Sequence, residues 1–263
     1  MTRESKRARS WPLAIPLAIV LSGCNLGAST STPQPQVLTV TASTPSPPSP
    51  SQSSGNGGEC GHDYFPTDEG ATWEYAGSNS YAGAFHQTVT ITESRDNGFT
   101  MTFQASTDDV TLSLEYGCDD GNLTLLDPLQ QFAAGSASGS GGTAVITTQG
   151  QTGVTLLADL QAGLTWQQTV QGTVQGPDVL LHGDYVFDNV ARGLEVTTVP
   201  FGTFDAMRVD TEVQGKLEGE DQPPCQVTTW YAEDVGPIKT VFTCDMPGTA
   251  LENTTELESY DSP

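Results

Sequence analysis

Residues 98–104 read Gly-Phe-Thr-Met-Thr-Phe-Gln, with an apolar side chain at every second position. The same alternation of apolar and polar residues recurs at 85–92 and 110–116. Successive side chains of a β-strand point to opposite faces, so a period of two predicts strands with one apolar and one solvated face. Such strands are typical of antiparallel sheets, and most of the polar positions here are Thr.

Turn signals separate the predicted strands, at Asp96-Asn97-Gly98, Asp119-Asp120-Gly121 and Gly176-Pro177-Asp178. No window longer than about 12 residues has a sustained helical period. A short helix is predicted at 127–135, because Asp127 is a good N-cap, Pro128 suits the first turn and Gly135 suits the end. The leucines of 156–160 predict one further helical turn.

We therefore predict a mainly β fold of antiparallel sheets, built as a curved sheet, a half-barrel or a sandwich, with at most one or two short helices. Similar strings predict two related halves, at 61–130 and 155–245. The pairs of strings are Gly70-Ala71-Thr72-Trp73 with Gly163-Leu164-Thr165-Trp166, and 115–121 with 230–236. The alternative is that such strings are common in β proteins and recur by chance.

The composition divides the chain at Cys60. Residues 25–59 are dominated by Ser, Thr, Pro, Gln and Gly, with no aromatic residue and no charge before Glu59. Such a segment cannot bury enough apolar surface to offset its ordering entropy. We predict a disordered tether at 24–59 and a single β-rich domain at 60–263.

The first residues have the pattern of a bacterial lipoprotein signal. Four basic residues precede position 10, and a short apolar stretch at 11–21 ends in Leu21-Ser22-Gly23-Cys24. Small residues give a peptidase access to the chain before Cys24, and the thiol of Cys24 is the site for the lipid. We predict a signal peptide at 1–23 and lipidation, including palmitate, at Cys24. The alternative is an ordinary signal with a chance cysteine.

The charge excludes one class of partner and defines the anchor. Removal of residues 1–23 takes away four of the nine basic residues and one of the 32 acidic residues, so the formal charge falls from −23 to −26. This sign opposes binding to nucleic acid and to anionic headgroups. We therefore expect acyl chains alone to hold the protein on the bacterial cell membrane, facing outside the cytoplasm, with the acidic residues of turns and of the 252–261 tail as a solubilising coat.

Four cysteines besides Cys24 predict two disulfides, since exported chains meet an oxidising environment. Strands at 225–232 and 237–244 with a turn at 233–236 would place Cys225 directly opposite Cys244. Cys60 and Cys118 then pair by elimination. No C-x-x-C pair supports a zinc site instead.

The chain carries no recognisable catalytic or cofactor motif, and we predict neither catalytic residues nor a cofactor nor a metal site. The histidines, at 62, 86 and 182, lack the spacing of a zinc site. Paired carboxylates are plentiful, but most lie at predicted turns, where Asp bonds its own backbone. The string Asp119-Asp120-Gly121-Asn122 offers calcium ligands but lacks the spacing and distal Glu of a calcium loop.

Several aromatic residues fall in predicted strands and have two interpretations. Such side chains stack on sugars or lipids in some proteins, but they more often anchor a core. We interpret Trp73 and Trp166 as core anchors that begin each half. The set is Trp73, Tyr75, Trp166, Trp230 and Tyr231.

Three ordered motifs resemble a group of uncharacterised bacterial envelope lipoproteins. They are Tyr64-Phe65-Pro66 with Gly70-x-x-Trp73-x-Tyr75, then Val199-Pro200-Phe201-Gly202-Thr203-Phe204-Asp205-Ala206, then Trp230-Tyr231-Ala232-x-x-Val235-Gly236-x-Ile238-Lys239. The resemblance covers about residues 64–243 and implies an exported β-rich domain without catalytic residues to transfer. The tether and the four cysteines are outside that pattern.

These observations predict a membrane-anchored extracytoplasmic lipoprotein that presents a binding or scaffolding domain and is not an enzyme. The alternative is a carrier that holds a hydrophobic ligand, such as a lipid, in a groove between the two halves. The sequence does not identify the ligand or the protein partner.

Overall fold

The computed structural model describes residues 60–263 apart from 81–82, 107–110, 130–144, 176–179 and 247–248. The predicted signal, Cys24 and the tether lie outside the described residues. The strands are β1 (Thr72–Asn79), β2 (Gly83–Arg95), β3 (Gly98–Ala105), β4 (Thr111–Asp119), β5 (Asn122–Leu125), β6 (Val145–Thr152), β7 (Thr165–Gln175), β8 (Leu180–Val199), β9 (Gly202–Leu217), β10 (Glu220–Asp221), β11 (Cys225–Ala232), β12 (Gly236–Met246) and β13 (Thr249–Asp261).

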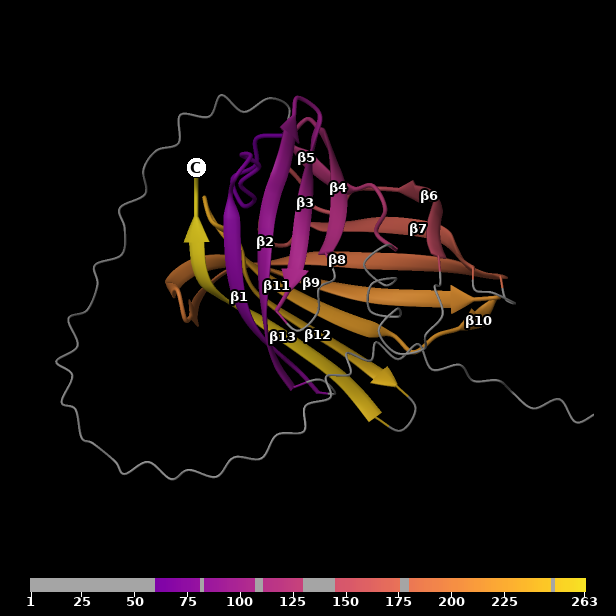
Figure 1. The fold of residues 1–263 in the computed structure, drawn as a ribbon. Helices are drawn as coiled ribbons and strands as arrows, with labels where there is room; N and C mark the ends of the chain where they lie inside the picture. Colours follow the sequence, from indigo (N-terminus) through magenta and orange to yellow (C-terminus); the bar gives the residue numbers. More distant parts are fainter. Residues whose placement is uncertain (1–59, 81–82, 107–110, 130–144, 176–179, 247–248) are drawn as a thin grey trace, which may run out of the picture.

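All of these strands belong to one antiparallel sheet, which confirms the predicted mainly β class. Along the sheet the order is β5-β4-β3-β2-β1-β13-β12-β11-β9-β8-β7-β6, with β10 paired to β9. The sheet curves so strongly that β1–β4 lie in front of β8–β12 in Figure 1. Because β5 and β6 do not pair with each other, the sheet remains open.

The apolar face of the curved sheet encloses an aromatic core. The ring of Phe65 lies 6.3 Å from Trp73, 5.7 Å from Phe99 and 6.0 Å from Tyr116, centroid to centroid. Phe99 also stacks on Tyr116 at 4.8 Å. The alternation that predicted β3 is therefore realised, with Phe99 and Met101 buried and the intervening Thr residues on the other face.

The predicted acidic tail is wrong, because residues 249–261 form a strand inside the sheet. The strand β13 pairs with β12 on one side and with β1 on the other. Leu251 and Leu257 are buried, whereas Glu252 and Glu258 are exposed on the opposite face. The acidic residues are thus the solvated half of an alternating strand rather than a separate coat.

The predicted helices are absent from the described part of the chain. Residues 127–129 form a turn, and 130–135 lie outside the described residues. The hydroxyl of Thr148 donates to the carboxylate of Asp127 at 2.5 Å, so the Asp127 side chain is bonded to β6. Leu156 exchanges two backbone hydrogen bonds with Leu123, of 2.9 and 3.0 Å, and so forms an isolated bridge to β5 where a helical turn was predicted.

The two Gly-x-Thr-Trp strings occupy equivalent places, which supports related halves. Each begins with a glycine of positive φ, 96° at Gly70 and 88° at Gly163, and leads into the first strand of its half. In each half, the chain entering this strand bonds the following strand next to a register shift. The shift follows Ile91 in β2 and Ala191 in β8. The bonds are Gly70 N to Ile91 O (2.8 Å), Ile91 N to Ala71 O (2.9 Å), Gly163 N to Ala191 O (2.7 Å) and Ala191 N to Leu164 O (2.9 Å).

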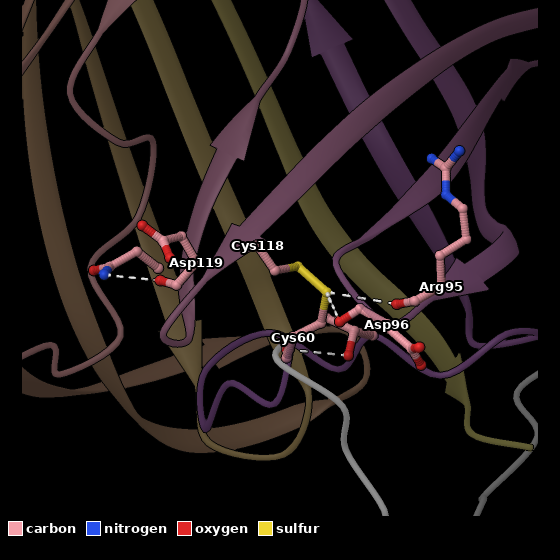
Figure 2. The surroundings of a disulfide bond; sticks show 7 residues. Cys60, Arg95, Asp96, Cys118 and Asp119 are labelled. Carbon is pink, nitrogen blue, oxygen red and sulfur yellow. Dashed lines mark hydrogen bonds between the residues drawn. A yellow bond between two sulfur atoms is a disulfide. The ribbon is translucent and has the colours of Figure 1, made fainter.

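Both predicted disulfides are present with the predicted partners. Cys225 and Cys244 lie opposite each other in the β11–β12 register, with their Cα atoms 4.3 Å apart. Cys60 joins Cys118 of β4, with a Cα–Cα distance of 5.1 Å, and so fixes the start of the described chain against the sheet (Figure 2).

We expect the longer disulfide loop to contribute more stability. The paired cysteines are 58 residues apart in Cys60–Cys118 and 19 apart in Cys225–Cys244. By loop-closure entropy, Cys60→Ser should lower the free energy of unfolding by about 4 kcal/mol and Cys225→Ser by about 3 kcal/mol. Urea denaturation measures both, and peptide mapping of Cys225→Ser should still find Cys60 joined to Cys118. A Cys60–Cys244 peptide in the wild-type protein would contradict this connectivity.

Candidate interaction surface

The histidines have structural roles or lie on the surface. The Nε2 of His62 bonds the carbonyl of Leu157 at 2.9 Å, and its Nδ1 accepts the backbone N–H of Tyr64 at 3.0 Å. With Nδ1 accepting, the ring is neutral, and burial lowers the pKa of His62 below its ordinary value. His86 bonds Glu258 at 3.0 Å on the exposed face, and His182 is also exposed.

The half-buried His62 predicts a loss of stability in mild acid. Its unfolded form takes up a proton below the ordinary pKa of 6.5, whereas the folded form resists protonation. Its contribution is thus fully present above that pH and is lost as the pH falls toward the lower folded pKa. In urea denaturation at pH 7.5 and 5.5, the wild type should lose more stability than His62→Gln. An equal loss in both proteins would contradict this role.

The Asp119–Asn122 string is a tight turn in which the Asn122 side chain is bonded within the protein. Asp120 and Gly121 have positive φ angles of 48° and 78°. The side-chain amide of Asn122 donates to the carbonyl of Asp119 at 3.0 Å and accepts the N–H of Ala158 at 3.0 Å. Within the described ranges, no three His, Cys, Asp or Glu side chains converge as a metal site would require.

A cluster of charged residues surrounds Trp230 on the Thr-rich face, and we call it the Trp230 cluster. Trp230 lies between its cross-strand neighbours Arg208 and Lys239, each with its charged group 5.7 Å from the ring centre. The indole N–H of Trp230 donates to the carboxylate of Glu195. Trp230 is therefore half-buried beside charged residues, whereas Trp73 is 1% exposed and hydrogen-bonded to Val235.

The positive charges of the Trp230 cluster are all paired. The carboxylate of Asp210 accepts bonds of 2.8 Å from both Arg192 and Arg208, and Lys239 lies 2.7 Å from Glu256. Partial burial opposes ionisation of Asp210, but the bonds from the two arginines outweigh it and lower its pKa. The cluster therefore connects neighbouring strands and leaves no free cation for an anionic ligand.

A second surface feature is the hairpin arm at 193–206, here called the β8–β9 arm. The neighbouring strand β7 pairs with β8 only as far as Val190, and β11 pairs with β9 only as far as Ala206. The arm thus extends past its neighbours on both sides. On it, Leu194 is 62% exposed and Val196 is 73% exposed, the highest values among the large apolar residues described.

One face of the β8–β9 arm is packed and the other is open. Thr197, Val199 and Ala206 are buried. The N–H of Phe201 at the tip donates to the carbonyl of Leu257 in β13 at 2.9 Å, which holds the arm in place. On the other face, Met207 opposite Leu194 is buried. The remaining residues of that face are all exposed, namely Leu194, Val196, Thr198, Thr203 and Asp205.

The β8 edge of the arm has backbone groups that point away from the sheet. A two-residue turn joins Val199 to Gly202, and such flanking residues form a hydrogen-bonded pair. By alternation, Leu194, Val196 and Thr198 direct their N–H and C=O groups to the free side of β8. No strand pairs with this edge in the described part of the chain.

The first half has a comparable edge of different character. Beyond the equivalent bonds to Ile91, residues 92–95 of β2 have no partner in β1. They read Thr-Glu-Ser-Arg, and all four are exposed. Charged residues protect an edge from other strands, and this protection is missing at Leu194 and Val196.

The chain matches no protein-family model and no curated protein sequence. Its structure resembles that of a "putative lipoprotein" from Parabacteroides distasonis ATCC 8503, with a TM-score of 0.54 and 16% identity over 76% of this chain and 99% of that one. It also resembles a "putative exported protein with YmcC-like fold" from Bacteroides fragilis NCTC 9343, with a TM-score of 0.52 and 14% identity over 76% of this chain and 100% of that one. At these identities the likeness establishes a shared fold.

No helix long and apolar enough to cross a membrane occurs in the described ranges. Cys24, the predicted attachment site, lies outside them. The four disulfide cysteines are structural. The β8–β9 arm was not predicted from the sequence as a surface, although Leu194 and Val196 alternate with Glu195 and Thr197 as in a strand.

Proposed function

We propose that this protein is an extracytoplasmic lipoprotein, anchored through Cys24, whose non-enzymatic β domain binds another protein through the β8–β9 arm. The observation that carries the binding role is the exposed, unpaired apolar edge at Leu194 and Val196. The lipoprotein role is supported by the string ending at Cys24, by the resemblance of the three motifs and by the names of the two proteins that share the fold.

The proposed absence of catalysis is supported by how the chemical groups are used. His62 is committed to two hydrogen bonds, and His86 and His182 lie on the surface. Among the described carboxylates, Asp210 has a lowered pKa. It is paired with two arginines and is therefore a poor proton acceptor. A general base needs an available group near a reacting atom, and these residues do not offer one.

The carrier of a hydrophobic ligand is the second candidate, and one observation favours it. Phe187 and Val213 are cross-strand neighbours, as are Val227 and Phe242, and all four are only half-buried although they share a face with buried Val209. Against this, Phe65, Trp73, Phe99 and Tyr116 fill the apolar face elsewhere.

Native mass spectrometry separates the two candidates. The protein purified from membranes should show only the mass of the lipidated chain, because the proposed function needs no bound lipid. Urea-denatured and refolded protein is the control, since it has lost any ligand acquired in the cell. A native-only mass increment of several hundred daltons, removed by Phe242→Glu, would support the carrier and contradict the proposal.

The anchor has its own test. Wild-type protein should incorporate labelled palmitate and sediment with membranes, whereas Cys24→Ser should do neither, because the acyl chains supply the membrane affinity. Cys60→Ser is the matched control and should remain acylated. Membrane sedimentation of Cys24→Ser equal to that of the wild type would contradict an anchor at this residue.

A photo-crosslinking side chain tests the binding surface in cells. Placed at Val196, it should give discrete crosslinked products, because that side chain faces the proposed partner. Placed at Ser94 on the polar edge of the first half, it should give none. Absence of products at Val196, or equal products at both positions, would contradict binding through the arm.

A further inference from the structure

We propose that the β8 edge of the arm takes up an extended, basic segment of a partner protein as an additional antiparallel strand. This inference rests on the proposed binding function and specifies its chemistry. It follows from three properties of the arm: its free backbone groups, its exposed apolar side chains and its charge.

The backbone groups provide the affinity. Leu194, Val196 and Thr198 each present one N–H and one C=O group on the free side of β8. Just before the arm begins, Ala191 points its backbone groups the same way and bonds Gly163 and Leu164 of the chain entering β7. The ladder that β7 forms with β8 therefore stops at Ala191, and an added strand would continue it along the arm.

The side chains select an apolar face on the partner. Cross-strand neighbours share a face, so an added strand would place alternate residues beside Leu194, Val196 and Thr198. Leu194 and Val196 lose their solvent exposure only if those residues are apolar. On the opposite face of the arm, Thr197 and Val199 are buried, whereas Glu195 is exposed.

The charge favours a basic partner over a second copy of this chain. Residues 193–206 contain Glu195 and Asp205 and no Lys or Arg. Asp205 is exposed, lies opposite Val196 and has no ion-pair partner in the described part of the chain. Two copies of the mature chain meeting at this edge would each bring a formal charge of −26, whereas Lys or Arg on a partner would be attracted to it.

Peptide binding to the full-length protein in a non-ionic detergent tests the proposal. The probe is a fluorescein-labelled, amidated heptapeptide of alternating Lys and Val, with Lys at both ends. Its valines would lie beside Leu194 and Val196, so their amide N–H groups would point at β8. Methylation of the valine amides should weaken binding at least about tenfold, since each methyl removes a hydrogen bond at the interface. Methylation of the three lysine amides, after the first residue, is the matched control and should leave affinity within about twofold.

Variants of the edge complete the experiment. Val196→Pro removes the outward N–H while leaving the bonds to β9, and should weaken binding at least about tenfold. Val196→Lys adds a repelling charge without changing the backbone, and serves if the proline variant fails to fold. Ser94→Pro, on the polar edge of the first half, should bind like the wild type. A peptide with Glu in place of Lys should bind about tenfold more weakly.

Each contrary outcome has a distinct meaning. Absence of peptide binding to the wild type, or binding unaffected by valine methylation and by both Val196 variants, would overturn strand addition. A dimer in analytical ultracentrifugation that Val196→Lys dissociates would overturn it in favour of a second copy. Crosslinks to another protein at Val196 in cells would support the proposed binding function even where strand addition is overturned. Absence of those crosslinks would contradict both the binding function and strand addition.

Discussion

The pairing of β1 with β13 is the constraint on which the rest of the structure depends. It joins Thr72–Asn79 to the last strand and makes one sheet from two series of hairpins. Each series alone would expose its apolar face, and three or more strands need such a face covered for stability. The pairing brings Trp73 onto Tyr260, with ring centres 5.4 Å apart, and lets the indole of Trp73 bond Val235 from the second half. The core is therefore shared between the halves.

Much of the fold could be predicted because its signals are local. Alternation at 98–104 reports on adjacent residues, and the β11–β12 turn at 233–235, together with a register shift next to Trp230, aligns Cys225 with Cys244. The position of β13 could not be predicted in this way, since its neighbour β1 is distant in sequence and its glutamates resemble a charged tail. Trp230 shows the same limit, because alternation assigns it to a face without saying that Arg208 and Lys239 surround it.

The two halves share a backbone arrangement and differ at the surface. After the equivalent bonds to Ile91 and Ala191, one strand continues as Thr-Glu-Ser-Arg and the other as a longer arm with Leu194 and Val196. The shared backbone arrangement requires particular glycines and buried residues. At a free edge, side chains are restricted only by the need to keep the protein soluble. The amino-acid composition cannot predict a site at this edge, because the edge is free only beyond the end of β7.

The place of β13 also has a consequence for the time at which the protein can fold. A chain is made from its N-terminus, and β1 lacks its second neighbour until residues 249–261 have emerged. Until then β1 and β12 each have an unpaired edge beside apolar residues such as Trp73 and Ile238. The β1–β13 contacts form only after a long loop has closed, and that closure loses conformational entropy before any contact stabilises it. We therefore expect folding to be slow and to depend on the complete chain. An incomplete chain is therefore a substrate for chaperones and proteases rather than a smaller working domain.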